Sequence, residues 1–195
     1  MDVMERILKL VILDRDGVIN QDSDDYIKSP DEWVPIDGSA EAIARLNASG
    51  YKVVVATNQS GIGRGYYDPK TLTMIHLKMI NHLAEHKARL DGIFFCPHAP
   101  DDGCDCRKPL PGLLDQVMAH LELPSLDGAL MVGDSLRDLQ AGVARQCVPV
   151  LVKTGKGERT LAKGLPAPFD DALVFDSLAD LVDHLLLNDP EEVFF

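Results

Sequence analysis

The 195-residue sequence has no apolar run approaching the roughly 18 to 20 residues that a membrane-spanning helix needs. Residues 1–10 also lack the basic start, the apolar run and the small-residue cleavage site of a signal peptide. Basic residues are outnumbered by acidic ones, with 19 lysines and arginines and 31 aspartates and glutamates. The formal net charge of −12 disfavours binding to nucleic acid or to an anionic membrane surface. We therefore expect a cytoplasmic protein.

Cysteine is also scarce, but three of the four cysteines lie close together in the segment CPHAPDDGCDC, residues 96–106. Clustered cysteines in a cytosolic protein favour a metal over disulfides. Three thiolates and one imidazole would form a closed, structural zinc site with the ligands Cys96, His98, Cys104 and Cys106. A disulfide or a reduced, metal-free loop are the alternatives. A bound zinc ion would order this loop, which ends directly before Arg107 and Lys108.

Short apolar runs rich in β-branched residues alternate with stretches that have the apolar spacing of helices. This alternation predicts one α/β domain over residues 1–195, a Rossmann-like three-layer sandwich whose mostly parallel sheet is covered on both faces. Residues 188–195 are expected to form a loose tail. The predicted strands are 7–13, 52–56, 92–95, 129–132, 148–152 and 172–175, and the predicted helices are 39–49, 69–88, 111–121, 137–145 and 177–187.

Polar residues follow several of these strands, and ligands of parallel sheets bind beyond the carboxyl ends of the strands. Asp14 and Asp16 end the first strand, Thr57 ends the second, and Lys108 follows the loop after the third. The fourth strand runs into GDSLRD, which contains Asp134 and Asp138. Carboxylates held close together repel one another, which raises their pKa values. A group of four at one edge of the sheet therefore indicates a bound cation. Oxygen ligands of this kind suit Mg²⁺.

This set of residues has the chemistry of phosphoryl transfer. Asp14 is the predicted nucleophile, since a carboxylate can form a covalent acyl phosphate. Asp16 is the predicted general acid for the leaving alcohol and then the base for the attacking water. Lys108 and Thr57 would stabilise the phosphoryl oxygens, and Asp134 would bind Mg²⁺. Asp138, one helical turn after Asp134, would support the metal site or hold Lys108 by an ion pair.

The four motifs DRDG, TN, RKP and GDSLRD resemble those of the haloacid dehalogenase (HAD) superfamily of phosphatases, over about residues 7 to 187. The resemblance implies an aspartyl-phosphate intermediate and one Mg²⁺ ion bound by Asp14, Asp16 and Asp134, with Asp16 contributing its backbone carbonyl. Larger members carry a cap domain between the motifs. The short spacing from Asp14 to Thr57 leaves no room for one, so substrate selection rests on the loops 20–37, 58–68 and 96–108.

These loops resemble one subfamily, the heptose 1,7-bisphosphate 7-phosphatases, which serve the nucleotide-activated heptose route to lipopolysaccharide core. The resemblance implies a small phosphorylated sugar as substrate, with Arg107 near the second, distal phosphate, where a planar bidentate donor is favoured. Ser135 stands where some members have lysine, which leaves the preferred anomer open. The remaining expected substrate contacts are Asp22, Ser23, Asp24 and Asp25 with sugar hydroxyls, and Asn58, Gln59 and Ser60 beside the phosphate.

Two other functions compete with this one. Histidinol-phosphate phosphatases share the zinc loop and the four motifs, but NQSGIGRG and RKPLPG match the heptose type better, and a cationic substrate gains nothing from Arg107. Receiver domains, which are phospho-binding modules, also gather aspartates, a threonine and a lysine on a parallel sheet. Their order differs, because an acidic pair here follows the fourth strand. We expect a monomer, and leave open whether residues 153–160 reach the rim of the site.

Overall fold

The computed structural model describes residues 8–170 and 172–187 of the chain. Six parallel strands form one sheet in the order β3-β2-β1-β4-β5-β6. The predicted α/β sandwich is confirmed, and the sheet is parallel throughout its described strands. The strands are β1 (Leu10–Leu13), β2 (Lys52–Asn58), β3 (Gly92–Cys96), β4 (Leu130–Gly133), β5 (Val148–Val152) and β6 (Leu173–Phe175).

Alternate residues of each central strand enter the two layers of the core, because side chains of a strand point to opposite faces. In β1, Val11 and Leu13 belong to one buried cluster, whereas Leu10 and Ile12 belong to the other. Both faces are apolar, which is why these strands read as continuous hydrophobic runs in the sequence.

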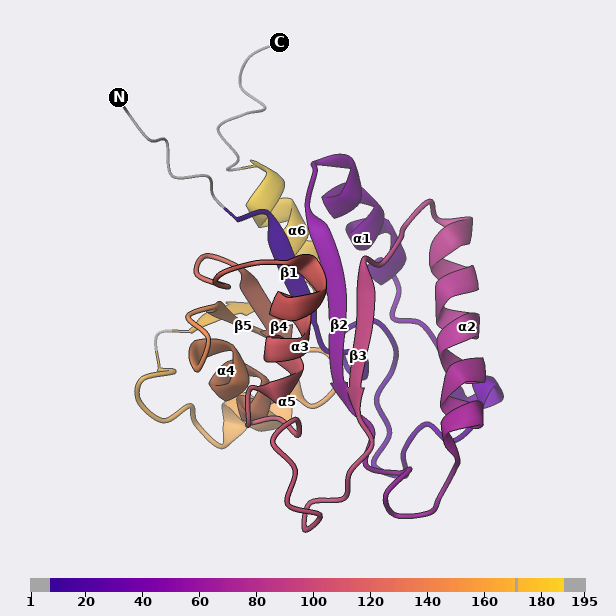
Figure 1. The fold of residues 1–195 in the computed structure, drawn as a ribbon. Helices are drawn as coiled ribbons and strands as arrows, with labels where there is room; N and C mark the ends of the chain where they lie inside the picture. The colour runs from indigo at the N-terminus through magenta and orange to yellow at the C-terminus, as the bar shows by residue number, and fades with distance from the viewer. Residues whose placement is uncertain (1–7, 171, 188–195) are drawn as a thin grey trace.

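Helices cover both faces of the sheet (Figure 1). The layer on one face consists of α1 (Ser39–Ala48), α2 (Pro69–Glu85) and α6 (Leu178–Leu187), which pack with Val11 and its cluster. The layer on the other face contains α3 (Gly112–Leu121) and α4 (Leu136–Val143). A sixth helix, α5 (Gly157–Ala162), and a 3-10 turn, η1 (Pro30–Glu32), were not predicted from the sequence.

The chain order fixes where a ligand site can form. Strands β1 and β4 are neighbours in the sheet, although β2 and β3 come between them in sequence. The connection after β1 therefore runs to one side of the sheet and the connection after β4 runs to the other. This reversal opens a crevice at the carboxyl ends of the two strands. Asp14 directly follows β1, and Asp134 directly follows β4. The fold thus brings the two aspartates together at the switch point.

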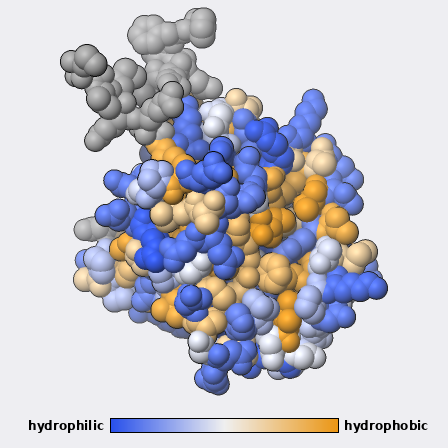
Figure 2. Space-filling view, viewed as in Figure 1, coloured by the Kyte–Doolittle hydropathy of each residue, from blue (hydrophilic) through white to orange (hydrophobic). Residues whose placement is uncertain are grey.

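The observed elements begin and end close to the predicted ones, and β2 extends to Asn58. The predicted tail, 188–195, lies outside the described residues. Within residues 8–170 and 172–187 no helix combines the length and apolarity needed to cross a membrane. On the face shown in Figure 2, hydrophilic and hydrophobic residues are interspersed.

Candidate active site

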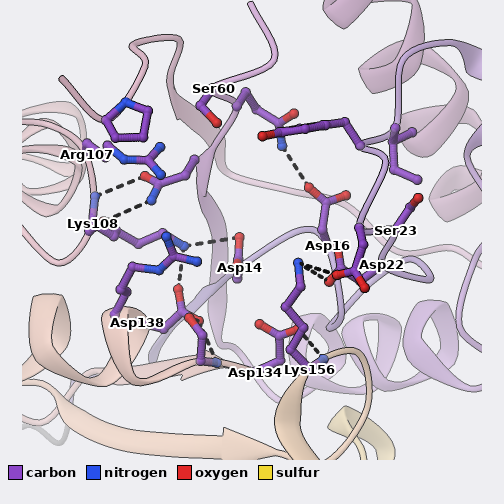
Figure 3. Close-up of a pocket in the computed structure, with 18 of the residues that line it drawn as sticks. Asp14, Asp16, Asp22, Ser23, Ser60, Arg107, Lys108, Asp134, Asp138 and Lys156 are labelled. Carbon is purple, nitrogen blue, oxygen red and sulfur yellow. Dashed lines mark hydrogen bonds and ion pairs between the residues drawn. The ribbon is translucent and has the colours of Figure 1, made fainter. Parts of the chain in front are cut away.

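A cavity of about 340 Å³ lies at the carboxyl end of the strands. Figure 3 shows Asp14 between Lys108 on one side and Asp16 on the other. The cavity is lined by Asp14, Asp16, Asp22, Ser23, Asp24, Tyr26, Ile27, Asn58, Gln59, Ser60, Arg64, Pro100, Arg107, Lys108, Asp134, Ser135, Arg137, Asp138 and Lys156. Most of the predicted site residues therefore meet in one place. Thr57 and Asp25 are not among the lining residues.

Lys108 is almost completely buried and its ammonium group has three acceptors. Lys108 Nζ lies 2.6 Å from Asp138 Oδ1, 3.1 Å from Asp14 Oδ1 and 2.7 Å from the carbonyl oxygen of Ala56. Burial alone would lower the pKa of Lys108, but Asp138 and then Asp14 outweigh burial and raise it. The lysine is therefore charged, and Asp138 and Ala56 fix its charge beside Asp14.

The second motif positions this lysine through its backbone. The side chain of Asn58 donates to the carbonyl oxygen of Lys108 and accepts from its N–H, each at 3.0 Å. The buried hydroxyl of Thr57 accepts from Gln59 Nε2 at 3.0 Å. Asn58 thus supports the main chain of Lys108, and the Thr57 hydroxyl points to Gln59 instead of lining the cavity.

Asp16 is held as an anion by its neighbours. Arg15, which is fully buried, donates to both carboxylate oxygens, at distances from 2.9 to 3.2 Å. Asn20 Nδ2 and Gln59 Nε2 donate as well, each at 2.9 Å. Burial alone would raise the pKa of Asp16, but Arg15 and these hydrogen bonds together lower it below its ordinary value. Arg15, Asn20 and the side-chain role of Gln59 were not foreseen from the sequence.

Asp14 and Asp134 have the opposite electrostatic environment. Burial raises the pKa of Asp14 to about 7, and the nearby Asp138 adds to the rise while Lys108 opposes it. Burial likewise raises the pKa of Asp134 to about 8, with further contributions from Asp138 and Asp14. Each carboxylate lacks enough positive charge around it when only protein groups are counted, so this part of the cavity suits a cation.

The donor atoms here fit Mg²⁺. One carboxylate oxygen each of Asp14, Asp134 and Asp138 lies within 4.8 Å of the others. An all-oxygen set of this kind is what Mg²⁺ prefers. Both carboxylate oxygens of Asp138 are engaged, Oδ1 by Lys108 and Oδ2 by Ser135, whereas Lys108 contacts only Oδ1 of Asp14. Asp14 and Asp134 are therefore the available side-chain ligands. The carboxylate of Asp16 faces Arg15, so its backbone carbonyl remains the group expected to reach the metal.

Two glycines pack directly against Asp134. A Cβ atom on Gly17 would lie 2.0 Å from Asp134 Oδ2, and one on Gly155 would lie 2.3 Å from it. Both glycines also have positive φ angles, of 83° and 58°, which other residues rarely adopt. Next to Gly155, the backbone N–H of Lys156 donates to Asp134 Oδ2 at 2.7 Å. Residues 153–160 therefore reach the site and help to orient a predicted metal ligand.

Lys156 also connects this segment to the loop after β1. Lys156 Nζ lies 2.6 Å from Asp22 Oδ2, and Arg159 pairs with Asp24 at 3.0 Å. Asp22, Ser23 and Asp24 line the cavity as expected for sugar contacts, with Asp22 already bound to a lysine. Asp25 does not line the cavity, and its main chain is engaged: its N–H donates to Ser23 Oγ, and its carbonyl oxygen accepts from Lys28.

The remaining predicted contacts occupy the wall near β2 and β4. Ser60, Arg107 and Ser135 all line the cavity. The hydroxyl of Ser135 donates to Asp138 Oδ2 at 2.8 Å, so it is engaged in the start of α4. Two further arginines, Arg64 and Arg137, line the same wall and were missed. Their position within NQSGIGRG and GDSLRD is the one signal in the sequence that could have identified them.

The predicted zinc ligands come together beside this wall. Cys96 Sγ lies 3.5 Å from His98 Nδ1 and 3.6 Å from Cys104 Sγ, and Cys106 Sγ lies 3.4 Å from the same imidazole nitrogen. A tetrahedral site with zinc–sulfur bonds near 2.3 Å has sulfur–sulfur edges of roughly 3.8 Å, so these donors fit zinc. All four cysteines are free thiols, which excludes the disulfide in this structure.

Comparison with known sequences identifies relatives over most of the chain. Residues 105–181 match a family model described as HAD-hydrolase-like. A D-glycero-beta-D-manno-heptose-1,7-bisphosphate 7-phosphatase from Pseudomonas aeruginosa is 56% identical over 177 residues, which cover 91% of this chain and 97% of the relative. The enzyme of the same name from Bordetella bronchiseptica is 52% identical, covering 92% of this chain and 98% of the relative.

Comparison with solved structures identifies the same family. The crystal structure of a D,D-heptose 1,7-bisphosphate phosphatase from B. bronchiseptica, complexed with magnesium and phosphate, matches with a TM-score of 0.86 and 52% identity. The match covers 91% of this chain and 98% of that one. The corresponding enzyme from Burkholderia thailandensis gives a TM-score of 0.70 at 46% identity, with 91% and 97% of the two chains covered. The chain therefore belongs to the D-glycero-beta-D-manno-heptose-1,7-bisphosphate 7-phosphatase family of HAD-like hydrolases.

Proposed function

We propose that this protein removes the phosphate from carbon 7 of D-glycero-beta-D-manno-heptose 1,7-bisphosphate, through a phosphorylated Asp14. The observation that carries the proposal is the pairing of Asp14 with a buried, charged lysine at the floor of the cavity, 3.1 Å away. The relatives described above, which are named for this reaction, support the choice of substrate.

In the first step, a carboxylate oxygen of Asp14 forms a bond to phosphorus while the bond from phosphorus to the carbon-7 oxygen breaks. Lys108 stabilises the negative charge on the phosphoryl oxygens, and Asp138 keeps the ammonium group in place. Asp16 gives its proton to the departing alcohol oxygen. Its hydrogen bonds from Arg15 favour the ionised form, so Asp16 has to take up a proton from water before this step, and it recovers a proton in the second step.

In the second step, water attacks the phosphorus of phosphorylated Asp14, and Asp16 takes a proton from that water. The bond between Asp14 and phosphorus breaks, which releases inorganic phosphate and restores the carboxylate. The lowered pKa of Asp16 suits this role as a base. Asp14, Asp134 and the backbone carbonyl of Asp16 would hold Mg²⁺, which would supply positive charge to offset the repulsion between the phosphate and the attacking carboxylate.

Recognition of the sugar rests on the two ends of the cavity. Asp22, Ser23 and Asp24 offer acceptors for sugar hydroxyls at one end, and Arg107 offers a planar donor for the distal phosphate at the other. Figure 3 shows Arg107 across the cavity from Asp22 and Ser23. The proposal includes a single-domain, monomeric enzyme in the cytoplasm. The net charge of −12 disfavours polyanionic partners such as nucleic acid.

The test measures phosphate release with Mg²⁺ from equal concentrations of heptose 1,7-bisphosphate, histidinol phosphate and fructose 1,6-bisphosphate. We expect the heptose to be cleaved with the highest kcat/KM, and Asp14→Asn to abolish turnover. Preference for histidinol phosphate would keep the mechanism and overturn the substrate. Failure to cleave any of the three, in protein loaded with zinc and Mg²⁺, would favour a binding module.

A further inference from the structure

Two buried side chains connect the Asp16 carboxylate to the end of the loop after β2. Gln59 Nε2 donates to Asp16 Oδ2 at 2.9 Å, and the hydroxyl of Tyr67 donates to Gln59 Oε1 at 2.7 Å. Gln59 and Tyr67 are only 4% and 9% exposed, so water competes little for these two hydrogen bonds. Tyr67 does not line the catalytic cavity. Its hydroxyl therefore acts on the site through Gln59.

The amide of Gln59 has one orientation that satisfies its neighbours. Its two N–H donors bind Asp16 Oδ2 and the Thr57 hydroxyl, and its oxygen accepts from Tyr67. The reverse orientation would place the amide oxygen against the Asp16 carboxylate, where two acceptors would repel each other. Tyr67 is therefore the donor to Gln59. Burial raises the pKa of Tyr67 to about 12, so the hydroxyl keeps the proton that it donates.

Packing fixes the ring of Tyr67. A Cβ atom on Gly61 would lie 2.3 Å from the ring carbon Cε1, so the ring lies directly against the backbone of the loop. The N–H of Tyr66 donates to the carbonyl oxygen of Gly61 at 2.8 Å, which holds this turn together. On the other side, Asp68 is the N-cap of α2 and accepts from the N–H of Thr71 at 2.7 Å. Tyr67 thus lies between two ordered segments.

Gln59 contacts the oxygen of Asp16 that has fewer donors around it. Oδ1 accepts three hydrogen bonds, two from Arg15 and one from Asn20. Oδ2 accepts one from Gln59 and a longer one, at 3.2 Å, from Arg15. Because each carboxylate oxygen has a limited number of lone pairs, Oδ2 has more capacity left for a proton than Oδ1.

We infer that Tyr67 is a positioning residue for the acid–base steps, because through Gln59 it fixes Oδ2 of Asp16 for proton exchange with the leaving alcohol and the attacking water. The inference rests on the proposed function, which takes Asp16 as the acid and the base. Without the Tyr67 hydroxyl, Gln59 Oε1 would lose the one hydrogen bond that it accepts within residues 8–170 and 172–187. A buried acceptor without a partner is costly, so the amide would adopt other orientations and release Asp16.

The experiment removes only the hydroxyl, in Tyr67→Phe, and compares two substrates with different leaving groups. For heptose 1,7-bisphosphate, kcat/KM covers the steps up to departure of the alcohol, which needs a proton. We expect it to fall by roughly tenfold, a part of the roughly 10²- to 10⁴-fold that a positioned acid contributes. KM should stay unchanged, since Tyr67 is outside the cavity. For para-nitrophenyl phosphate, whose leaving group departs without a proton, kcat/KM should stay unchanged.

A double variant tests the route through Gln59 on the heptose substrate alone. Gln59→Ala should lower kcat by more than Tyr67→Phe does, because it removes the contact with Asp16 itself. Adding Tyr67→Phe to Gln59→Ala should cause no further loss of kcat, since the hydroxyl then has no amide to orient. Two residues that act through one contact are non-additive in this way, whereas independent residues add.

Tyr51→Phe is the matched control. Tyr51 is as buried as Tyr67, at 7% exposed, but it precedes β2 and so lies at the opposite end of the strand from the site. We expect it to leave kcat/KM unchanged for both substrates. An unchanged value for the heptose in Tyr67→Phe, an equal loss for both substrates, or additive losses in the double variant would overturn the inference while the proposed function stands. A wild-type enzyme that does not cleave heptose 1,7-bisphosphate would instead overturn the proposed function, and the inference with it.

Discussion

Lys108 Nζ and Asp138 Oδ1 lie 2.6 Å apart, and both side chains are 1% exposed. A buried ion pair of this kind holds its members in one geometry, because separating them leaves an uncompensated charge away from water. The second oxygen of Asp138 accepts from the N–H and the hydroxyl of Ser135 at the start of α4. The pair therefore ties the lysine that faces Asp14 to the first turn of a helix.

Replacing Asp138 should damage both stability and catalysis. We expect Asp138→Ala to lower the free energy of unfolding by about 3 to 5 kcal/mol, since the buried Lys108 loses its nearer carboxylate and keeps only Asp14. We also expect kcat to fall by roughly tenfold to a hundredfold, as the ammonium group shifts away from the phosphoryl oxygens. Urea denaturation and steady-state kinetics measure the two effects.

Asp115→Ala provides the control for this prediction. Asp115 also pairs with a basic residue, Arg145, but these side chains are 48% and 34% exposed. An exposed pair contributes little, so this variant should lose no more than about 1 kcal/mol and keep its kcat. Equal stability losses in the two variants would contradict the role given to the buried pair.

The neutral variant Asp134→Asn should change how stability depends on pH. The pKa of Asp134 is raised to about 8, so the folded protein binds this proton more tightly than the unfolded chain. The resulting stabilisation is complete below the ordinary pKa of 3.8 and is lost as the pH rises through about 8. Without Mg²⁺, Asp134→Asn should therefore have a Tm above that of the wild type, by a margin that grows between about pH 5 and about pH 9.

Mg²⁺ separates this effect from a general change in stability. It should raise the Tm of the wild type, because a ligand that binds only the folded state stabilises it. It should raise the Tm of Asp134→Asn far less, since a predicted ligand is missing. Differential scanning fluorimetry with and without Mg²⁺ gives both comparisons. Parallel pH profiles for the two proteins, or an equal response to Mg²⁺, would argue against Asp134 as a metal ligand.

Loss of zinc should weaken catalysis through the position of Lys108. Cys96 ends β3, and its carbonyl oxygen accepts from the N–H of Gln59 at 2.7 Å, while Cys106 lies two residues before Lys108. Release of the loop would therefore disturb the segment around Gln59 and the segment around Lys108. We expect Cys104→Ser to lose its zinc, as measured by atomic emission. We also expect its kcat, measured by phosphate release, to fall several-fold.

Cys147→Ala is the control, because Cys147 is buried outside the ligand cluster. It should keep both its zinc and its kcat. The nucleophile Asp14 is not part of the zinc loop, so the zinc-free enzyme should still become phosphorylated. Full activity in a preparation free of zinc would contradict the prediction.

The sequence revealed the sheet because buried parallel strands such as Leu10–Leu13 are continuous apolar runs. It did not reveal α5, Gly157–Ala162, which begins with glycine and has too few apolar residues for a helical period. The aspartates and Lys108 were predictable as motif residues at strand ends. The contact of Lys156 with Asp134 was not, since only the folded chain brings the loop after β5 to the loop after β4.

Side-chain partners were also beyond the sequence. Asn58 was expected beside the phosphate, yet its amide binds the backbone of Lys108, a contact between residues far apart along the chain. Arg15 stands between the two motif aspartates in sequence. Only the folded structure shows that it is buried and donates hydrogen bonds to Asp16. Local pattern thus identified the reacting groups, whereas the residues that orient them depend on tertiary packing.

Capture of the phosphorylated enzyme would test most directly whether Asp14 is the nucleophile. Wild-type protein with Mg²⁺ is mixed with heptose 1,7-bisphosphate, quenched in acid within one turnover, digested and examined by mass spectrometry. We expect one added phosphoryl group on the peptide that contains Asp14, and none in Asp14→Asn. Phosphate release by Asp14→Asn at the wild-type rate, or a phosphoryl group on another residue of the wild type, would contradict this role of Asp14.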